Sequence, residues 1–214
     1  VDRGMVYAIA HIRGGMEKGK KWYENGKKKN KLNSFKDFIS CAEFLKKENI
    51  SKNITIHGGS AGGLLIGASL NISPDTFHCA VAEVPFVDVL NTILDDTLPL
   101  TPPEWEEWGN PIKNKNDFDY IGSYSPYDNI KKQNYPAILA TSGLTDPRVT
   151  YWEATKWIAK LRSKKTNDNP LFLKTYTEAG HGGMAGRYNQ IKETAFVYAF
   201  ILWRNNLIKR PFTR

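Results

Sequence analysis

The fold of this chain is decided by one stretch of sequence, Ile54-Thr-Ile-His-Gly-Gly-Ser60-Ala-Gly-Gly63. Its β-branched beginning predicts a strand over Asn53–His57, and the apolar residues after Ser60 predict a helix over Ala61–Asn71. Ser60 therefore lies in a Gly-x-Ser-x-Gly pattern at a sharp strand-to-helix turn, which is the arrangement of a nucleophile elbow. The flanking glycines avoid the collisions that side chains would make in such a turn. A glycine-rich turn without a catalytic role is the alternative.

Strand-like and helix-like segments alternate along the chain on both sides of this turn. Strands are expected over Met5–His11, Asn53–His57, Cys79–Val84, Pro136–Ser142 and Leu171–Tyr176. Helices are expected over Ser34–Glu48, Ala61–Asn71, an apolar stripe from Ala154 to Leu161, and Gln190–Leu207. The alternation predicts an α/β fold, in which helices cover both faces of a mostly parallel sheet. A proline- and tryptophan-rich excursion between Leu98 and Pro111 is expected to shape a pocket.

A serine nucleophile needs a general base, and the base needs an orienting carboxylate. His181 lies between glycines, after the last predicted strand and before the last predicted helix. Asp146 follows the strand over Pro136–Ser142, and the active residues of such folds gather at the carboxyl ends of parallel strands. Ser60, Asp146 and His181 occur in the chain order of an α/β-hydrolase. We therefore predict that these three are the catalytic residues.

Other histidines and acids are weaker candidates for these roles. His11, His57 and His78 each adjoin or lie in a predicted strand and are expected to be structural. Asp88 and Asp128 do not follow a strand as directly as the predicted acid does. The histidines are too dispersed for a metal-ligand set, and no phosphate-binding glycine loop with a lysine occurs. We expect neither a metal nor a cofactor.

Charge is unevenly distributed along the chain. Residues 53–112 contain eight acids and no Lys or Arg, so they carry −8 and the other 154 residues carry +16 within a total of +8. A basic total raises nucleic acid as a partner, but lysines scattered over solvated helix faces are the simpler interpretation. We expect no nucleic-acid partner. The acidic block is more informative, because it surrounds the predicted active site in sequence.

Eight stretches, in order along nearly the whole chain, carry a more specific resemblance. They are Ala10-His-Ile-Arg-Gly-Gly15, Trp22-Tyr-Glu24, Gly58-Gly-Ser-Ala-Gly-Gly63, Val84-Pro-Phe-Val-Asp-Val89, Glu106-Glu-Trp-Gly-Asn-Pro111, Ser123-Tyr-Ser-Pro-Tyr-Asp-Asn129, Tyr151-Trp-Glu153 and Ala179-Gly-His-Gly-Gly183. Together they resemble the catalytic domain of the prolyl oligopeptidase family of serine peptidases, and within it the oligopeptidase B (protease II) branch.

The resemblance implies cleavage of short peptides after Arg or Lys through an acyl-enzyme intermediate, with short basic peptides as partners. It places the basic side chain against a glutamate pair that matches Glu104 and Glu106, in agreement with the acidic block. A cationic side chain that enters a partly desolvated pocket needs such carboxylates. The resemblance also implies that the amide of Ala61 supplies half of an oxyanion hole. Arg148 matches an arginine that holds a substrate carbonyl in relatives.

The resemblance also indicates which parts of the family architecture are not matched. Family members carry an N-terminal β-propeller, earlier strands and a tyrosine that supplies the other half of the oxyanion hole, and none of these is matched within residues 1–214. We expect residues 1–214 to be a partial catalytic domain, with the N-terminal part of the same protein as its partner. Losing one oxyanion donor costs roughly 100- to 1000-fold in turnover, so little activity is expected from the chain alone.

Two other functions stay open. One is an inactive remnant that serves as an interaction domain, and the other is an esterase or aminopeptidase-like hydrolase of the same fold. No stretch is long and apolar enough to cross a bilayer, and we expect no membrane partner. Two cysteines, Cys41 and Cys79, make no disulfide framework, which is typical of a cytoplasmic protein.

Overall fold

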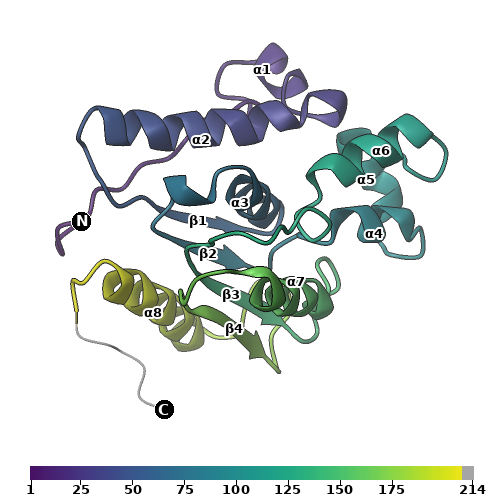
Figure 1. Cartoon of the computed structure of the whole chain (residues 1–214). Coiled ribbons are helices and arrows are strands. Elements are labelled where there is room, and N and C mark those ends of the chain that lie inside the picture. Colours follow the sequence, from purple (N-terminus) through teal and green to yellow (C-terminus); the bar gives the residue numbers. More distant parts are fainter. Residues whose placement is uncertain (209–214) are drawn as a thin grey trace.

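The computed structural model describes residues 1–208. Within these residues lies a four-stranded parallel sheet in the order β1-β2-β3-β4, which is also the order of the strands in the chain. The strands are β1 (Thr55–Gly59), β2 (Cys79–Glu83), β3 (Ala137–Gly143) and β4 (Leu171–Tyr176). Because neighbouring strands are parallel, each connection crosses over the sheet, and each one contains at least one helix (Figure 1).

Helices cover both faces of this sheet. On one face lie α3 (Ala61–Ile72) and α7 (Tyr151–Lys164), and α2 (Leu32–Lys47) packs against α3. On the other face lies α8 (Arg187–Arg204), which packs against β2 and β3. The predicted layers of helix, sheet and helix are therefore present.

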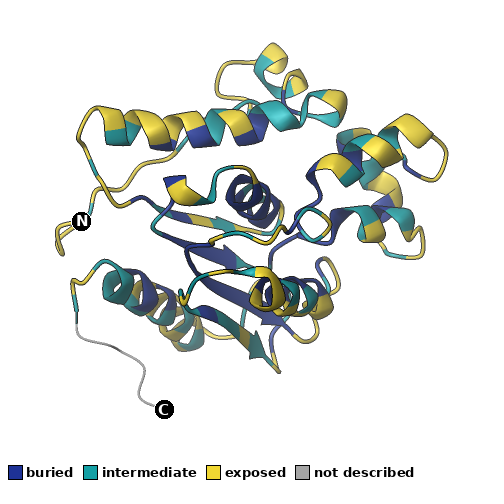
Figure 2. Ribbon diagram, viewed as in Figure 1, coloured by how far each residue is buried: buried dark blue, intermediate teal, exposed yellow. Residues whose placement is uncertain are grey.

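Two apolar clusters, one on each face, hold these layers together. β3 is buried along its whole length and β2 along all but its last residue, as is usual for strands that are covered on both faces. Ile138 and Trp157 meet in the cluster under α3 and α7, whereas Val81 and Phe200 meet in the cluster under α8. Figure 2 shows the buried positions concentrated in the sheet and on the helix faces turned toward it.

The remaining helices lie outside these layers. Their bounds are Lys20–Glu24 for α1, Val89–Leu94 for α4, Thr101–Trp108 for α5 and Lys115–Tyr124 for α6, with 3-10 turns at Lys28–Asn30 and Pro74–Thr76. The excursion expected between Leu98 and Pro111 thus contains α5. Its prolines, Pro102 and Pro103, stand in the first turn, where a missing N–H removes no helical hydrogen bond. Within residues 1–208 no helix has the length and hydrophobicity needed to span a membrane.

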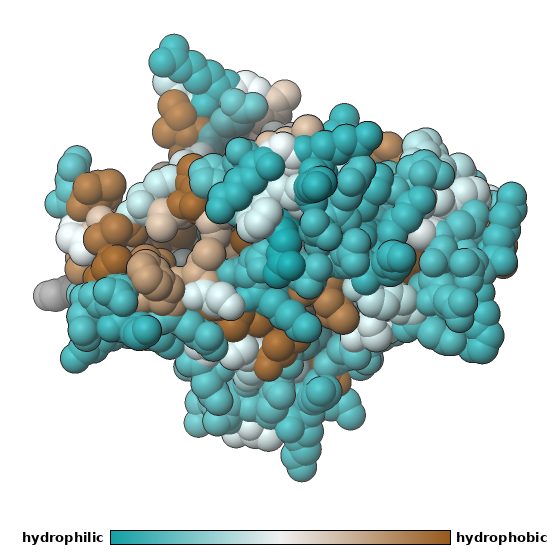
Figure 3. Space-filling model, turned by 90° about the horizontal axis from the view of Figure 1, so that it is seen from above, coloured by the Kyte–Doolittle hydropathy of each residue, from teal (hydrophilic) through white to brown (hydrophobic). Residues whose placement is uncertain are grey.

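The segment Met5–His11 is not a strand, which corrects the expectation from sequence. A strand requires a neighbour to pair with, and the described sheet ends at β1, with no ladder to this segment. Val6, Tyr7 and Ile9 are consequently 67%, 74% and 65% exposed. Figure 3 shows apolar side chains gathered on the side of the molecule where the chain begins in Figure 1. The other four predicted strands are present, each within two residues of the expected bounds.

The carboxyl ends of the strands define one edge of the sheet. Ser60 directly follows β1, Asp146 lies three residues after β3, and His181 lies in the loop after β4. Since parallel strands all end at the same edge, this topology brings together residues that are far apart in the chain.

Candidate active site

Ser60 occupies a strained turn between β1 and α3. Its φ of 54° and ψ of −122° lie in a region that residues with a side chain rarely adopt. Backbone hydrogen bonds hold the turn, since Ser60 N donates to Glu83 O at 2.9 Å and Phe86 N donates to Ser60 O at 3.0 Å. The end of β2 and the loop after it therefore fix the position of the serine.

Two glycines beside Ser60 are required by close contacts. A Cβ at Gly58 would lie 2.5 Å from the carbonyl oxygen of Gly62, and a Cβ at Gly63 would lie 2.4 Å from Cα of Pro85. A Cβ at Gly62 would meet nothing within 4 Å. The glycine pattern thus marks the turn correctly, but on the helix side the collision falls at Gly63.

The side chains of Ser60, His181 and Asp146, the three predicted catalytic residues, are joined in a series by two hydrogen bonds. His181 Nε2 lies 3.1 Å from Ser60 Oγ, and His181 Nδ1 lies 2.7 Å from Asp146 Oδ2. The side chain of His181 is 19% exposed and that of Asp146 is fully buried. When Nδ1–H donates to the carboxylate, the unprotonated Nε2 faces the hydroxyl and is able to accept its proton.

The carboxylate of Asp146 is oriented by its own loop. Its Oδ1 accepts the backbone N–H of Arg148 at 2.8 Å and that of Val149 at 3.1 Å. An aspartate that binds backbone amides two and three residues ahead stabilises a turn of this kind. Because Oδ1 is engaged in this way, Oδ2 is the oxygen directed at His181.

The loop that carries His181 is held on two sides. Gly143, at the end of β3, approaches it so closely that a Cβ there would lie 2.5 Å from Ala179 O. On the other side Met184 N donates to Glu193 Oε1 at 2.8 Å, which ties the loop to α8. Sequence reasoning did not identify Glu193, because nothing in the pattern of a helix marks an acid that binds the preceding loop.

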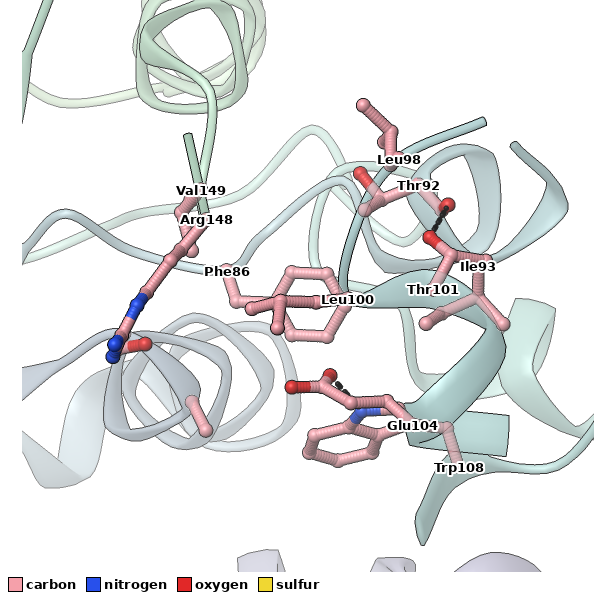
Figure 4. Close-up of a pocket in the computed structure, with 12 residues that line it drawn as sticks. Phe86, Thr92, Ile93, Leu98, Leu100, Thr101, Glu104, Trp108, Arg148 and Val149 are labelled. Carbon is pink, nitrogen blue, oxygen red and sulfur yellow. Dashed lines mark hydrogen bonds between the residues drawn. The ribbon is translucent and has the colours of Figure 1, made fainter. Parts of the chain in front are cut away.

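A pocket opens beside Ser60, and Figure 4 shows the residues that line it. Its walls are mainly apolar, and Glu104 is the one acidic residue among the described residues that line it. The carboxylate of Glu104 lies between the indole of Trp108 and the side chains of Phe86 and Leu100 (Figure 4). Trp108 Nε1 donates to Glu104 Oε2 at 2.7 Å. The pocket therefore offers a fixed carboxylate within apolar surroundings.

Glu106, the other glutamate of the expected pair, lies outside this pocket. Its side chain is 87% exposed and accepts a hydrogen bond from Lys28 Nζ at 2.9 Å. That hydrogen bond lowers the pKa of the Glu106 carboxyl. Residues two apart on a helix do not share a face, so α5 turns Glu106 away when it brings Glu104 to the pocket. The structure places one member of the expected pair at the site and not both.

Ala61 and Arg148 both line the pocket. The amide of Ala61 is the first of α3, where an N–H has no acceptor within the helix, so it is available to an oxyanion beside Ser60. Arg148 is exposed and lies on the opposite side of the pocket from Glu104 (Figure 4).

The remaining histidines and the rival acids do not take part in this series. His11 pairs with Glu17, His57 with Glu83, and His78 with the carbonyl oxygen of Arg204. Asp88 pairs with Lys156, and Asp128 is exposed. None of these contacts involves the series of Ser60, His181 and Asp146.

The topology and the site together define a class of protein. A parallel sheet with a nucleophile elbow after one strand, an acid after a later strand and a histidine after the last is an α/β-hydrolase.

Comparison with known proteins gives the family. The chain belongs to the prolyl oligopeptidase family, whose family model matches residues 1–206. It is 49% identical over 204 residues to Dipeptidyl aminopeptidase BI of Pseudoxanthomonas mexicana, covering 94% of this chain and 28% of that protein. It is also 49% identical over 204 residues to Protease 2 of Moraxella lacunata, covering 94% of this chain and 29% of that protein. The chain thus spans less than a third of the length of these relatives.

Solved structures of relatives confirm the α/β-hydrolase fold. Oligopeptidase B from Leishmania major matches with a TM-score of 0.94 at 50% identity, over 96% of this chain and 29% of that one. Oligopeptidase B from Trypanosoma brucei, in a closed form with covalently bound antipain, matches with a TM-score of 0.93 at 52% identity, over the same shares.

Proposed function

We propose that this chain is the catalytic part of a serine-type oligopeptidase that cleaves short peptides after Arg or Lys. The observation that carries the proposal is the 3.1 Å approach of His181 Nε2 to Ser60 Oγ beside the pocket, with Asp146 behind the imidazole. Membership of a peptidase family supports this class of reaction.

The proposed reaction begins when His181 Nε2 takes the proton of Ser60 as Oγ attacks the scissile carbonyl carbon. The carbonyl oxygen becomes an oxyanion, which the amide of Ala61 stabilises. The C–N bond then breaks, the leaving amine takes the proton from His181, and the acyl group remains on Ser60 as an ester. Water attacks this ester with the same histidine as base, which releases the carboxylate product and restores the serine.

The proposed preference for a basic residue comes from Glu104. The apolar walls of the pocket suit the aliphatic stem of Arg or Lys, and the carboxylate between them suits the charged end. Arg148, on the opposite side, is proposed to hold a backbone carbonyl of the substrate. Short basic peptides are therefore the substrates that this site favours.

Two proposals concern the setting of the site. The second oxyanion donor is proposed to come from the N-terminal part of the same protein, since the chain spans under a third of the length of its relatives.

A cytoplasmic location is proposed because Cys41 is exposed and Cys79 buried, both as free thiols, and thiols stay reduced in that compartment.

Covalent labelling by a fluorophosphonate tests the nucleophile. Together with the proposed N-terminal part, the chain is expected to be labelled, and the Ser60→Ala variant is expected to resist labelling. A panel of Arg-, Pro- and Ala-linked chromogenic peptides and a short acyl ester tests the specificity, with the Arg-linked peptide expected to react best. Preference for the Pro-linked peptide or for the ester would refute cleavage after basic residues.

An aminopeptidase-like hydrolase is the second candidate, favoured by the name of the relative from Pseudoxanthomonas mexicana. Blocking the N-terminus of the Arg-linked peptide separates the two candidates. An oligopeptidase of the proposed kind cleaves the blocked peptide, whereas an aminopeptidase requires the free amine. A correctly folded protein that resists labelling at Ser60 would instead indicate an inactive remnant.

A further inference from the structure

Glu153 is a fully buried carboxyl that the proposed reaction does not use. It is 0% exposed, and it lies in the first turn of α7, four residues after Val149 of the pocket lining. Its pKa is raised to about 7, mainly because burial disfavours the charged form. Acids are almost never fully buried unless they have compensating partners, so the identity of those partners indicates what the residue does.

The partners of Glu153 all come from one segment of the pocket wall. Its Oε2 accepts the backbone N–H groups of Val87 and Asp88, each at 2.9 Å. Its Oε1 accepts the hydroxyl of Thr92 at 2.7 Å. One carboxylate thus binds both ends of the segment Val87–Thr92, which leads from β2 into α4.

The near end of this segment adjoins the nucleophile. Phe86 directly precedes it, and the amide of Phe86 donates to the carbonyl oxygen of Ser60 at 3.0 Å. The ring of Phe86 packs against Trp108, with 5.5 Å between the ring centroids. Val87 therefore adjoins one wall of the pocket, while the serine turn is held in addition by the bond from Ser60 N to Glu83 O.

The far end of the segment is bonded to α5, the helix that carries Glu104. The hydroxyl of Thr101 donates to the carbonyl oxygen of Thr92 at 2.8 Å, and Trp105 Nε1 donates to the carbonyl oxygen of Ile93 at 3.2 Å. Thr101 and Trp105 both lie on α5. Glu153 is thus connected through one short segment to both the serine and the helix of the pocket carboxylate.

We propose that Glu153 is a positioning residue for basic substrates, which sets the placement of Glu104 relative to Ser60 by anchoring the segment Val87–Thr92. This inference rests on the proposed function and extends it. Glu153 does not line the substrate pocket and does not contact the reacting atoms. It therefore acts through the segment Val87–Thr92, which it anchors. Asp88 is the charged group that faces it, and Lys156 neutralises Asp88 from α7 through a 2.5 Å ion pair.

The test compares two readouts at the same serine. Cleavage of an Arg-linked peptide requires both Ser60 and a correctly placed Glu104, whereas labelling by a small alkyl fluorophosphonate requires only the serine and its histidine. Truncation in Glu153→Ala is expected to lower kcat/KM for the peptide about 30-fold, mainly through KM, and to change the labelling rate less than about 3-fold.

The Glu153→Gln variant provides the conservative rescue. Its amide oxygen is able to accept the N–H groups of Val87 and Asp88, while its NH2 donates to the Thr92 hydroxyl, which rotates to accept. Peptide cleavage and labelling by this variant are expected to stay within about 3-fold of the unmodified protein.

The Asn71→Ala variant provides a matched control. Asn71 is also buried and bonded, since its Nδ2 donates to Pro126 O at 2.8 Å and its Oδ1 accepts the Tyr135 hydroxyl at 3.1 Å. It lies at the end of α3 opposite to Ser60. Its loss is expected to lower the melting temperature while the ratio of peptide cleavage to labelling stays constant.

The outcomes separate the inference from the proposed function. A Glu153→Ala variant in which cleavage and labelling fall equally overturns the positioning role, and so does a changed ratio in Asn71→Ala. Where Glu153→Ala does not fold, Glu153→Asp replaces it, since its shorter carboxylate is expected to shift the ratio in the same direction; an unchanged ratio then overturns the role. Unmodified chain that, together with the proposed N-terminal part, is not labelled or shows no preference for basic peptides overturns the proposed function and the inference with it.

Discussion

Glu104 and Trp108 lie one turn apart on α5, and the indole Nε1 of Trp108 donates to Oε2 of Glu104 at 2.7 Å. The ring of Trp108 is itself held, since it packs against Phe86 and lies 4.6 Å from the ammonium of Lys31. This bond fixes one carboxylate oxygen and leaves the other for a ligand. Because the carboxylate is oriented before a substrate arrives, binding requires little further ordering of the site.

Removing the charge of Glu104 is expected to reduce the preference for basic residues. In Glu104→Gln the amide oxygen still accepts from Trp108, but the cationic side chain loses its counter-charge. A charge-assisted hydrogen bond is worth about 1.5–3 kcal/mol, so kcat/KM for the Arg-linked peptide should fall roughly 10- to 100-fold. The Ala-linked peptide should be unaffected. Glu106→Gln, on the exposed side of the same helix, should change neither rate; equal losses in the two variants would show that the pocket assignment is wrong.

Replacing the carboxylate that orients the histidine is expected to lower kcat severely. In Asp146→Asn the amide no longer accepts from His181 Nδ1 as the carboxylate does, so the imidazole adopts the tautomer that carries its proton on Nε2. A proton at Nε2 prevents the ring from taking the one on Ser60, and kcat should fall about 10,000-fold. Single-turnover and steady-state rates measure the effect. Asp128→Asn, which alters the exposed rival acid, is the control and should retain full activity.

A methyl group added in the serine turn is expected to lower the stability of the fold at Gly63 but not at Gly62. Gly63→Ala places a Cβ 2.4 Å from Pro85 and should lower the free energy of unfolding by about 1–3 kcal/mol. Gly62→Ala meets open space within the first turn of α3 and should raise stability by about 0.5–1 kcal/mol. Denaturant titrations of the two variants measure both changes. Similar destabilisation by both would show that the close approach of Pro85 does not govern the turn.

The serine turn and the three-residue series could be predicted because each depends on a local pattern and on chain order. A strand, a glycine-rich turn and an apolar helix are all encoded within a few residues of Ser60. The topology of a parallel sheet then brings the ends of later strands to the same edge. That rule needs no knowledge of side-chain packing, which is why Asp146 and His181 could be identified at a distance of many residues.

Features that depend on contacts between distant segments of the chain could not be predicted in the same way. Met5–His11 has the composition of a strand, but a strand also requires a neighbour, which sequence pattern does not reveal. The family resemblance implies a glutamate pair at Glu104 and Glu106, and only the structure shows that α5 turns the two side chains to different faces. Glu153 in the first turn of a helix is typical of a solvated acid, and only the fold shows that Val87–Thr92 covers it.

Glu153 is also expected to make the stability of the fold depend on pH. Its pKa is about 7 in the folded protein against an ordinary value of 4.5, mainly because burial disfavours the charged form. Above pH 4.5 the unfolded chain releases this proton while the folded protein keeps it. The contribution of this group to stability is therefore full below that value, falls as the pH rises toward about 7, and is constant above it. The total change is up to about 3 kcal/mol.

Glu153→Gln removes this titration and isolates its effect. The free energy of unfolding is measured by denaturant at about pH 4.5 and about pH 8 for both proteins, and the unmodified protein should lose stability relative to the variant as the pH rises. Asp88 and Lys156 are present in both proteins, so their contributions largely cancel in the difference. Asp119→Asn, which alters an exposed carboxyl on α6, should show no such trend. A difference between the two proteins that stays constant or grows in the opposite direction would mean that Glu153 is ionised throughout this range, stabilised by the amides of Val87 and Asp88.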